Sequence, residues 1–183
     1  GALARGLRGF VLGGRMASQR PPSTAKPAGP RVSVDGVREL LRVTPRASAT
    51  TGLRINLVVP AVSAASTFGG IRTAIDAFEA IAGGSPRRRI ISVRPVVPVD
   101  AAAFPDYRLV TAADDVDDPR QLVSLALPDG ATLPIGPGDV FIATFWTTAA
   151  WVLEVRRWQA ATFGRAPDWF AYLIQDFEPG FYP

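Results

Sequence analysis

The chain has 183 residues, 48% of them apolar, which allows one substantial hydrophobic core, and it contains no cysteine or histidine, which excludes disulfides, thiolate metal sites and imidazole-based catalysis. Residues 1–51 carry nine basic and two acidic side chains, whereas residues 52–183 carry eleven basic and fourteen acidic ones. The larger part is therefore mildly acidic, and neither a nucleic-acid-binding body nor a membrane-spanning run of roughly 18–20 apolar residues is expected.

Residues 1–51 are predicted to form a basic tail or linker rich in Pro, Ala and Gly. The segment Ala17–Pro30 has almost no large apolar side chain, so burial cannot offset the entropy that ordering would cost. A short helix is predicted at Val34–Val43, where apolar residues recur at helical spacing. The folded domain is expected to cover residues 52–183.

The domain is predicted to begin with a strand, a glycine turn and an amphipathic helix. Leu53–Val59 is rich in apolar and β-branched residues, which is typical of a strand buried on both sides in a parallel sheet. After the pair Gly69-Gly70, apolar residues from Ile71 to Ala82 keep helical spacing. Gly83-Gly84 then predicts the end of the helix.

Further strands are predicted at Ile90–Arg94 and Tyr107–Thr111. The basic run Arg87–Arg89 is expected to be a solvated loop. Leu122–Leu127 and Ala131–Ile135 flank an Asp-Gly pair, which predicts a β-hairpin.

The last third of the domain contains another strand, a helix and a final strand. Val140–Phe145 is predicted to be a buried strand by its composition, and Phe170–Ile174 a further strand. Thr147–Phe163 is predicted to be a helix, with Trp151 and Trp158 in its core stripe and Arg156 outside it. Strands alternating with helices predict an α/β fold: a Rossmann-like, open, mainly parallel sheet with helices on both faces. The strands at 53–59, 140–145 and 170–174 are expected to be neighbours in this sheet.

Ligands of open α/β sheets bind beyond the carboxyl ends of the strands, so segments that leave a strand are the candidate sites. Gly69 and Gly70 let backbone N–H groups approach a ligand phosphate, or they form a tight turn only. The chain lacks G-x-G-x-x-G and a P-loop lysine here, which argues against a nicotinamide or ATP site.

Two more segments leave predicted strands. Trp146 could stack on a sugar face, and Thr147 could contact the sugar or cap the helix. The loop after Ile174 carries Asp176 and Glu178 among aromatic residues and no basic residue. These carboxylates are the candidates for hydroxyl binding or proton transfer, with backbone capping as the structural alternative.

Four segments in this order, LRINLVVP, FGGIRTAIDAF, FIATFWTTAAWVL and YLIQDFEPGFYP, carry a family resemblance. The region from Leu53 to Pro183 resembles the N-terminal domain of WsaF-type rhamnosyltransferases, bacterial enzymes of polysaccharide biosynthesis with the GT-B architecture, among retaining, GT4-like glycosyltransferases. The resemblance implies the acceptor-side half of such an enzyme, cut before a C-terminal, donor-binding domain, and inactive alone. It implies a cytoplasmic location, including a peripheral one at the inner membrane.

The resemblance also implies the substrates and the roles of the site residues. The donor would be dTDP-rhamnose and the acceptor a glycan, with no further cofactor and no metal. Gly69-Gly70 would face the donor diphosphate, Trp146, Thr147 and Gln175 would contact the sugar or acceptor, and Asp176 and Glu178 would be catalytic. The alternative is a non-catalytic carbohydrate-binding or interaction module with the same fold, and a nucleotide-binding oxidoreductase is a weaker third possibility.

Overall fold

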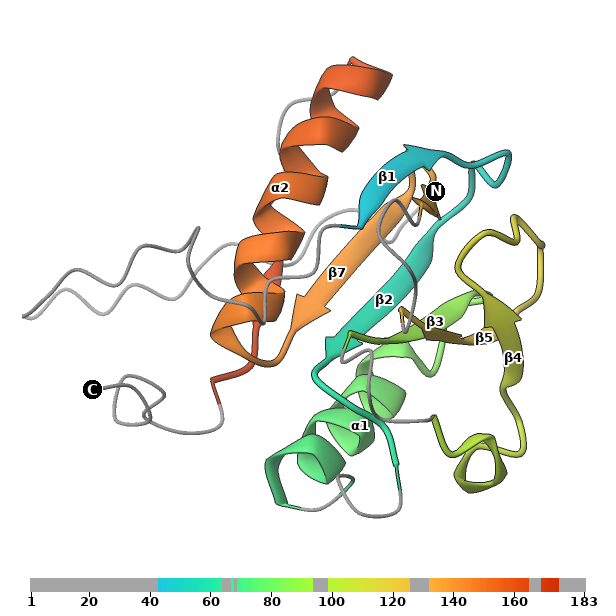
Figure 1. The fold of residues 1–183 in the computed structure, drawn as a ribbon, viewed down its shortest axis with the longest axis vertical. Coiled ribbons are helices and arrows are strands. Elements are labelled where there is room, and N and C mark those ends of the chain that lie inside the picture. Colours follow the sequence, from blue (N-terminus) through green and yellow to red (C-terminus); the bar gives the residue numbers. More distant parts are fainter. Residues whose placement is uncertain are drawn as a thin grey trace, which may run out of the picture. The chain divides into compact units, whose positions relative to one another are not determined.

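The structure is a computed structural model that describes residues 43–63, 67, 69–93, 99–125, 132–164 and 169–174. All of these residues belong to one unit, residues 33–183. Its strands are β1 Thr44–Ala47, β2 Arg54–Val59, β3 Arg88–Ser92, β4 Arg108–Thr111, β5 Arg120–Ser124, β6 Thr132–Ile135, β7 Asp139–Ala143 and β8 Ala171–Tyr172. Its helices are α1 Gly69–Ala82, the short 3₁₀ helix η2 Ala101–Ala103 and α2 Trp146–Phe163 (Figure 1).

Six strands form one parallel sheet in the order β4-β5-β3-β2-β7-β8. The three strands expected to be neighbours are therefore adjacent and parallel, as β2, β7 and β8. The α/β prediction is thus confirmed at the level of a mainly parallel sheet with helices.

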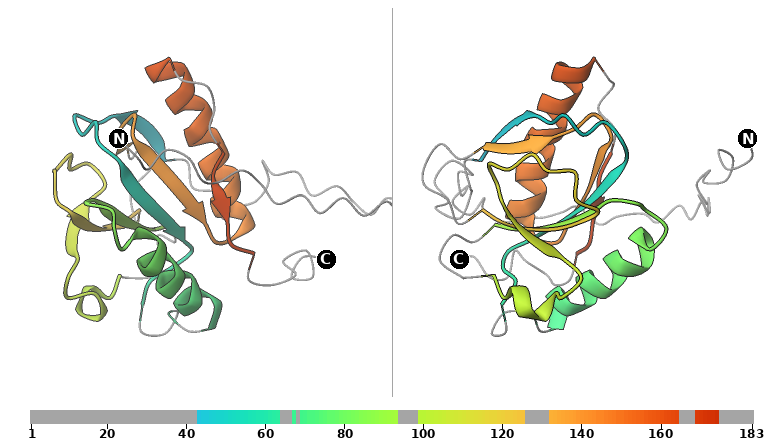
Figure 2. Two further views of the ribbon diagram at one scale, coloured as in Figure 1. Left: turned by 180° about the vertical axis from the view of Figure 1, so that it is seen from behind. Right: turned by 90° about the vertical axis from the view of Figure 1, so that its right-hand side faces the viewer.

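The central strands are buried on both faces because alternate side chains enter two different cores. Leu57 and Val59 of β2 pack in one cluster with Phe78 of α1, whereas Val58 packs in the other with Trp151 of α2. The sheet consequently separates the two helices, as the right-hand view of Figure 2 shows. Helices on both faces are thus confirmed.

The predicted hairpin is wrong. β5 has β3 on one side and β4 on the other, so neither of its edges is open to β6. β6 instead pairs in parallel with β1, and the two form a separate small sheet.

Two-sided burial of Phe170–Ile174 is also wrong. Within the described part of the sheet β8 is the outermost strand and spans two residues, and Ile174 is 71% exposed. An apolar composition therefore did not require a central position here.

The basic run Arg87–Arg89 is not a solvated loop, because β3 begins at Arg88 and both Arg88 and Arg89 are buried. Each buried arginine has acceptors supplied by other elements: Arg88 donates to Glu79 and Arg89 donates to Asn56. Polar partners from other elements thus allow strongly basic residues to enter the sheet.

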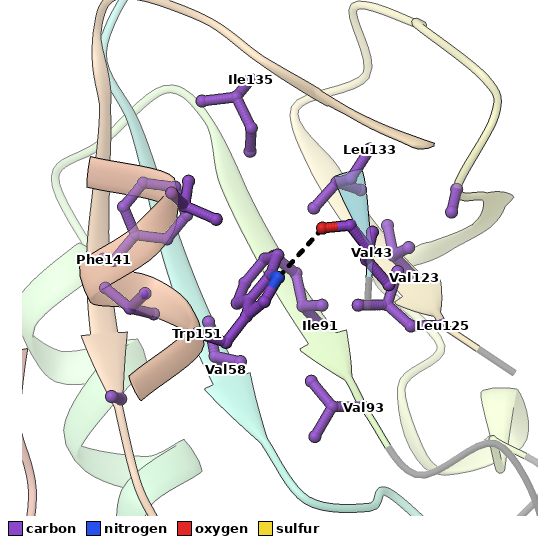
Figure 3. Packing of buried hydrophobic residues seen from close by; sticks show 14 of the residues in the cluster. Val43, Val58, Ile91, Val93, Val123, Leu125, Leu133, Ile135, Phe141 and Trp151 are labelled. Atoms are coloured by element: carbon purple, nitrogen blue, oxygen red, sulfur yellow. Dashed lines mark hydrogen bonds between the residues drawn. The ribbon is translucent and has the colours of Figure 1, made fainter. Parts of the chain in front are cut away.

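The small sheet places part of the predicted tail inside the domain. β1 lies upstream of residue 52, and Val43, just before it, is buried in the same core cluster as Trp151. Figure 3 shows the Trp151 indole pointing at the Val43 carbonyl, to which its Nε1 donates at 3.3 Å. Most of the predicted helix at Val34–Val43 lies outside the described residues.

Candidate functional site

The carboxyl ends of β2, β7 and β8 lie at one edge of the sheet, called the carboxyl edge below. Val58 is in register with Ala143, and Ala143 is in register with Tyr172. The segments that follow β2 and β7, which lead to Gly69-Gly70 and to Trp146-Thr147, therefore leave the sheet from the same edge.

Gly69 and Gly70 are the first residues of α1. Gly69 has φ of +51°, a left-handed conformation that favours glycine, and a Cβ built on it would meet nothing within 4 Å. The glycine is thus required by its backbone conformation and not by crowding. The first turn of α1 has no acidic residue, so its positive end is not neutralised by its own helix and can favour an anion.

Two hydroxyl groups, one at the end of β3 and one in the segment after β2, were not among the site residues predicted from the sequence. Oγ of the fully buried Ser92 and Oγ1 of Thr67 are buried and have no hydrogen-bond partner among the residues that the structure describes. Ser92 is in register with Val59 at the carboxyl end of β3, and the Thr67 N–H donates to Ser63 just after β2. The available sequence signal for Ser92 was a small polar residue directly after the apolar pair Ile90-Ile91.

The turn from β7 into α2 is held by threonine hydroxyls. Thr148 Oγ1 accepts from the backbone N–H groups of Thr144 and Phe145 at 3.1 and 3.0 Å and donates to the Phe145 carbonyl. Thr144 Oγ1 donates to the Val58 carbonyl at 2.9 Å, which ties the turn to β2. The helix is capped by Thr148 at its third position, with Phe145 as the N-cap residue.

Trp146 and Thr147 begin α2 but differ in exposure. Thr147 is buried, whereas Trp146 is half-buried and its ring centroid lies 6.2 Å from that of Phe145. A partly exposed indole at a strand exit can offer a flat apolar surface to a sugar ring. The expected core positions of Trp151 and Trp158 are confirmed, since Trp151 is buried and Trp158 packs against the same cluster.

The remaining predicted site residues, Gln175, Asp176 and Glu178, lie outside the described residues. Their chain position places them shortly after β8, which ends at Tyr172. Within the described ranges, no group of three or more His, Cys, Asp or Glu residues could hold a metal ion. Asp100, after β3, caps η2 by accepting from the Ala102 N–H at 3.2 Å.

The most deeply buried ion pairs lie at the opposite edge of the sheet, where β2, β3 and β7 begin, called the amino edge below. Asp139 accepts two hydrogen bonds from Arg54, at 2.6 and 2.7 Å, and lies 3.6 Å from Arg89 Nη2, and all three side chains are 1% exposed. Burial lowers the pKa of Arg89 to about 9, although the charge of Asp139 opposes this shift. Because solvent and ligands cannot reach this cluster, it organises the fold and is not part of the candidate site.

The same edge also fixes helix α2. Arg156 Nη1 donates to the Asp139 carbonyl at 3.1 Å, and Gln159 Nε2 donates to the Gly136 carbonyl at 2.6 Å. Arg156, expected outside the core stripe, is in fact buried, because these acceptors lie beneath the helix. No helix in the described part of the chain has the length and apolar character needed to cross a membrane.

No individual curated protein matches the chain. Residues 54–183, more than two thirds of the chain, match the family described as "WsaF, N-terminal domain". This match confirms the resemblance drawn from the four sequence segments and agrees with the parallel α/β sheet. The chain therefore belongs to the family of WsaF N-terminal domains, and it is a glycosyltransferase-related domain.

Proposed function

We propose that this chain is the acceptor-side domain of a retaining, GT-B-type rhamnosyltransferase that transfers rhamnose from dTDP-rhamnose to a cell-surface glycan. Membership of the WsaF N-terminal domain family over residues 54–183 is the observation that carries the proposal. The parallel strands β2, β7 and β8 support it, because their carboxyl ends meet at one edge of the sheet, where ligands of open α/β sheets bind. A second Rossmann-like domain would hold the nucleotide across a cleft from this edge.

In this proposal the start of α1 faces the donor diphosphate. The left-handed Gly69, the open space beside it and the absence of an acidic residue in the first turn support an anion at this helix end. Backbone N–H groups and cationic groups of the second domain would stabilise the departing diphosphate, and no covalent protein nucleophile is needed.

Trp146 would stack on a sugar ring, with Thr147 and Gln175 nearby, while Asp176 and Glu178 would bind hydroxyl groups or move a proton. The half-buried position of Trp146 at the start of α2 supports its part. For Thr147, burial of the side chain leaves the backbone as the group more able to reach a ligand. The protein would act in the cytoplasm, at the inner membrane surface where it is peripheral.

The first test measures transfer from dTDP-rhamnose to a rhamnose-containing glycan by the gene product that contains this chain, with Asp176→Asn and Glu178→Gln as variants. Both variants should lower the rate while leaving the melting temperature within about 2–4 °C, because neither removes core volume. Wild-type transfer rates in both variants would show that Asp176 and Glu178 are not needed for transfer, and would favour their structural alternative.

The second test measures glycan affinity of the 183-residue chain by calorimetry. Trp146→Ala should weaken binding about tenfold, the equivalent of roughly 1.4 kcal/mol. Trp169→Ala is the matched control, because Trp169 is 89% exposed but lies before β8 and not after its carboxyl end. Glycan binding with no transfer by the complete gene product would favour the carbohydrate-binding module, and absence of both would refute the proposal.

A further inference from the structure

Part of one sheet face is covered by the small β1–β6 sheet, whose strand β1 lies upstream of the family match. The core cluster on the α2 face includes Ile91 of β3, Val110 of β4 and Val123 of β5. Helix α2 contacts β7 and β1, whereas Leu133 and Ile135 of β6 and Val43, just before β1, complete this cluster. The small β1–β6 sheet therefore covers the apolar side chains of β3, β5 and β4 on this face, as a second helix would.

Residues 43–50, called the strap below, are fixed at both ends. At the first end, the Val43 carbonyl accepts from the Trp151 indole at 3.3 Å. At the other end, the carboxylate of Asp115 accepts from Ser48 Oγ at 2.6 Å and from the Ala49 N–H at 2.8 Å.

The strap also fits closely against the chain beside β6. The Ser48 N–H donates to the Ile135 carbonyl at 3.0 Å. A Cβ at Gly136 would lie only 2.1 Å from the Thr50 carbonyl oxygen, so glycine is needed for this approach. The strap thus joins three elements: helix α2, strand β6 and the segment between β4 and β5 that contains Asp115.

We propose that the strap is a positioning element for α2, and that Trp151 is the residue through which it acts on the sugar-facing start of that helix. Trp151 lies five residues after Trp146, about 7.5 Å along the helix axis. A shift of α2 at Trp151 must therefore move Trp146 relative to the carboxyl edge. The link to sugar binding rests on the proposed function, whereas the link between strap and helix does not.

The experiment compares Trp151→Phe with Trp158→Phe in the 183-residue chain. Both changes shorten a tryptophan that packs on the same cluster, but the structure gives only Trp151 a hydrogen bond to the strap. Trp151→Phe should raise amide hydrogen exchange about fivefold or more in both residues 44–50 and residues 149–152. It should also weaken binding of a rhamnose-containing glycan more than Trp158→Phe does at equal loss of melting temperature.

A second pair of variants, outside the hydrophobic core, keeps the test valid if Trp151→Phe does not fold. Asp115→Asn weakens the far end of the strap, whereas Asp117→Asn changes a neighbouring carboxylate that binds Arg87 and not the strap. Only Asp115→Asn should raise exchange in residues 44–50 and in the first turns of α2.

Faster exchange in the strap with unchanged exchange in α2 would overturn the proposal, and so would equal effects of the two members of either pair. If the wild-type chain does not bind the glycan and the complete gene product transfers no rhamnose, the proposed function fails, and the exchange data alone decide whether the strap positions α2.

Discussion

Replacement of Asp139 by Asn tests whether the buried charge cluster organises the domain. The Asp139 carboxylate accepts hydrogen bonds from Arg54, from Asn56 at 3.1 Å and from the Gly136 N–H at 2.7 Å. An asparagine keeps the shape but loses the charge and turns one acceptor into a donor that faces donor groups. Two guanidinium groups, Arg54 and Arg89, would then be buried without a counter-charge.

Breaking a buried ion pair by removing one partner costs about 3–5 kcal/mol. For a domain of this size we therefore expect the melting temperature of Asp139→Asn to fall by roughly 10–20 °C. The free energy of unfolding is measured by urea titration followed by circular dichroism. The matched control is Asp76→Asn, because Asp76 forms an ion pair with Arg72 at 3.1 Å on the exposed face of α1. Its loss should cost less than about 0.5 kcal/mol.

The pH dependence supplies a second measurement. Burial alone would raise the pKa of Asp139, but the hydrogen bonds from Arg54 and the charges of Arg89 and Arg54 outweigh burial and hold this pKa below its ordinary value of 3.8. A depressed pKa stabilises the fold at pH values above 3.8, and this contribution is lost as the pH falls through the folded-state value. The difference in unfolding free energy between wild type and Asp139→Asn should therefore narrow below about pH 4. The reasoning would be refuted if Asp139→Asn lowered the free energy of unfolding by less than about 1 kcal/mol and if this difference from wild type stayed constant with pH.

Three further substitutions test the local geometry. Gly69→Ala should cost about 1–2 kcal/mol through its positive φ alone, and a neutral result in urea unfolding would argue against the left-handed conformation. Gly136→Ala should lower the free energy of unfolding by about 1–3 kcal/mol or more, because its Cβ would clash with the Thr50 carbonyl. Gly84→Ala is the control and should cost far less, because a Cβ there would meet nothing within 4 Å; equal costs would contradict the close approach at Gly136. Thr148→Ala should cost about 1–2 kcal/mol by leaving two backbone N–H groups without their acceptor, and an unchanged melting temperature would contradict the cap.

The strands that could be predicted are those whose own residues form an almost continuous apolar run. Residues 53–59 and 140–145 became β2 and β7, since neighbouring side chains on both faces must enter a core. The same reasoning failed for 170–174, where a short apolar run lies at the sheet edge. Apolar composition reports a tendency to be buried but does not say how many neighbours a strand has.

The start of β3 and the whole of β1 could not be predicted because their stability depends on distant partners. Arg89 is buried only with Asn56, Pro134 and Asp139 around it, and these come from three other segments. In β1, the sequence TPRA has neither apolar alternation nor strong strand propensity. Its pairing with β6 and the bond from Trp151 bring together residues up to 108 positions apart, which no local pattern can indicate.

The two edges of the sheet differ in whether their buried polar groups have partners, and this difference supports the proposal that the carboxyl edge binds a ligand. At the amino edge even Nη2 of Arg89, which has no hydrogen bond, lies 3.6 Å from the Asp139 carboxylate. At the carboxyl edge the buried hydroxyls of Ser92 and Thr67 have no hydrogen-bond partner within the described part of the chain. An unsatisfied buried hydroxyl costs about 1–3 kcal/mol, and such departures from good local structure are expected where a fold serves function. The buried charges at the amino edge therefore stabilise the fold. The buried hydroxyl groups at the carboxyl edge, in contrast, remain able to form hydrogen bonds with a ligand.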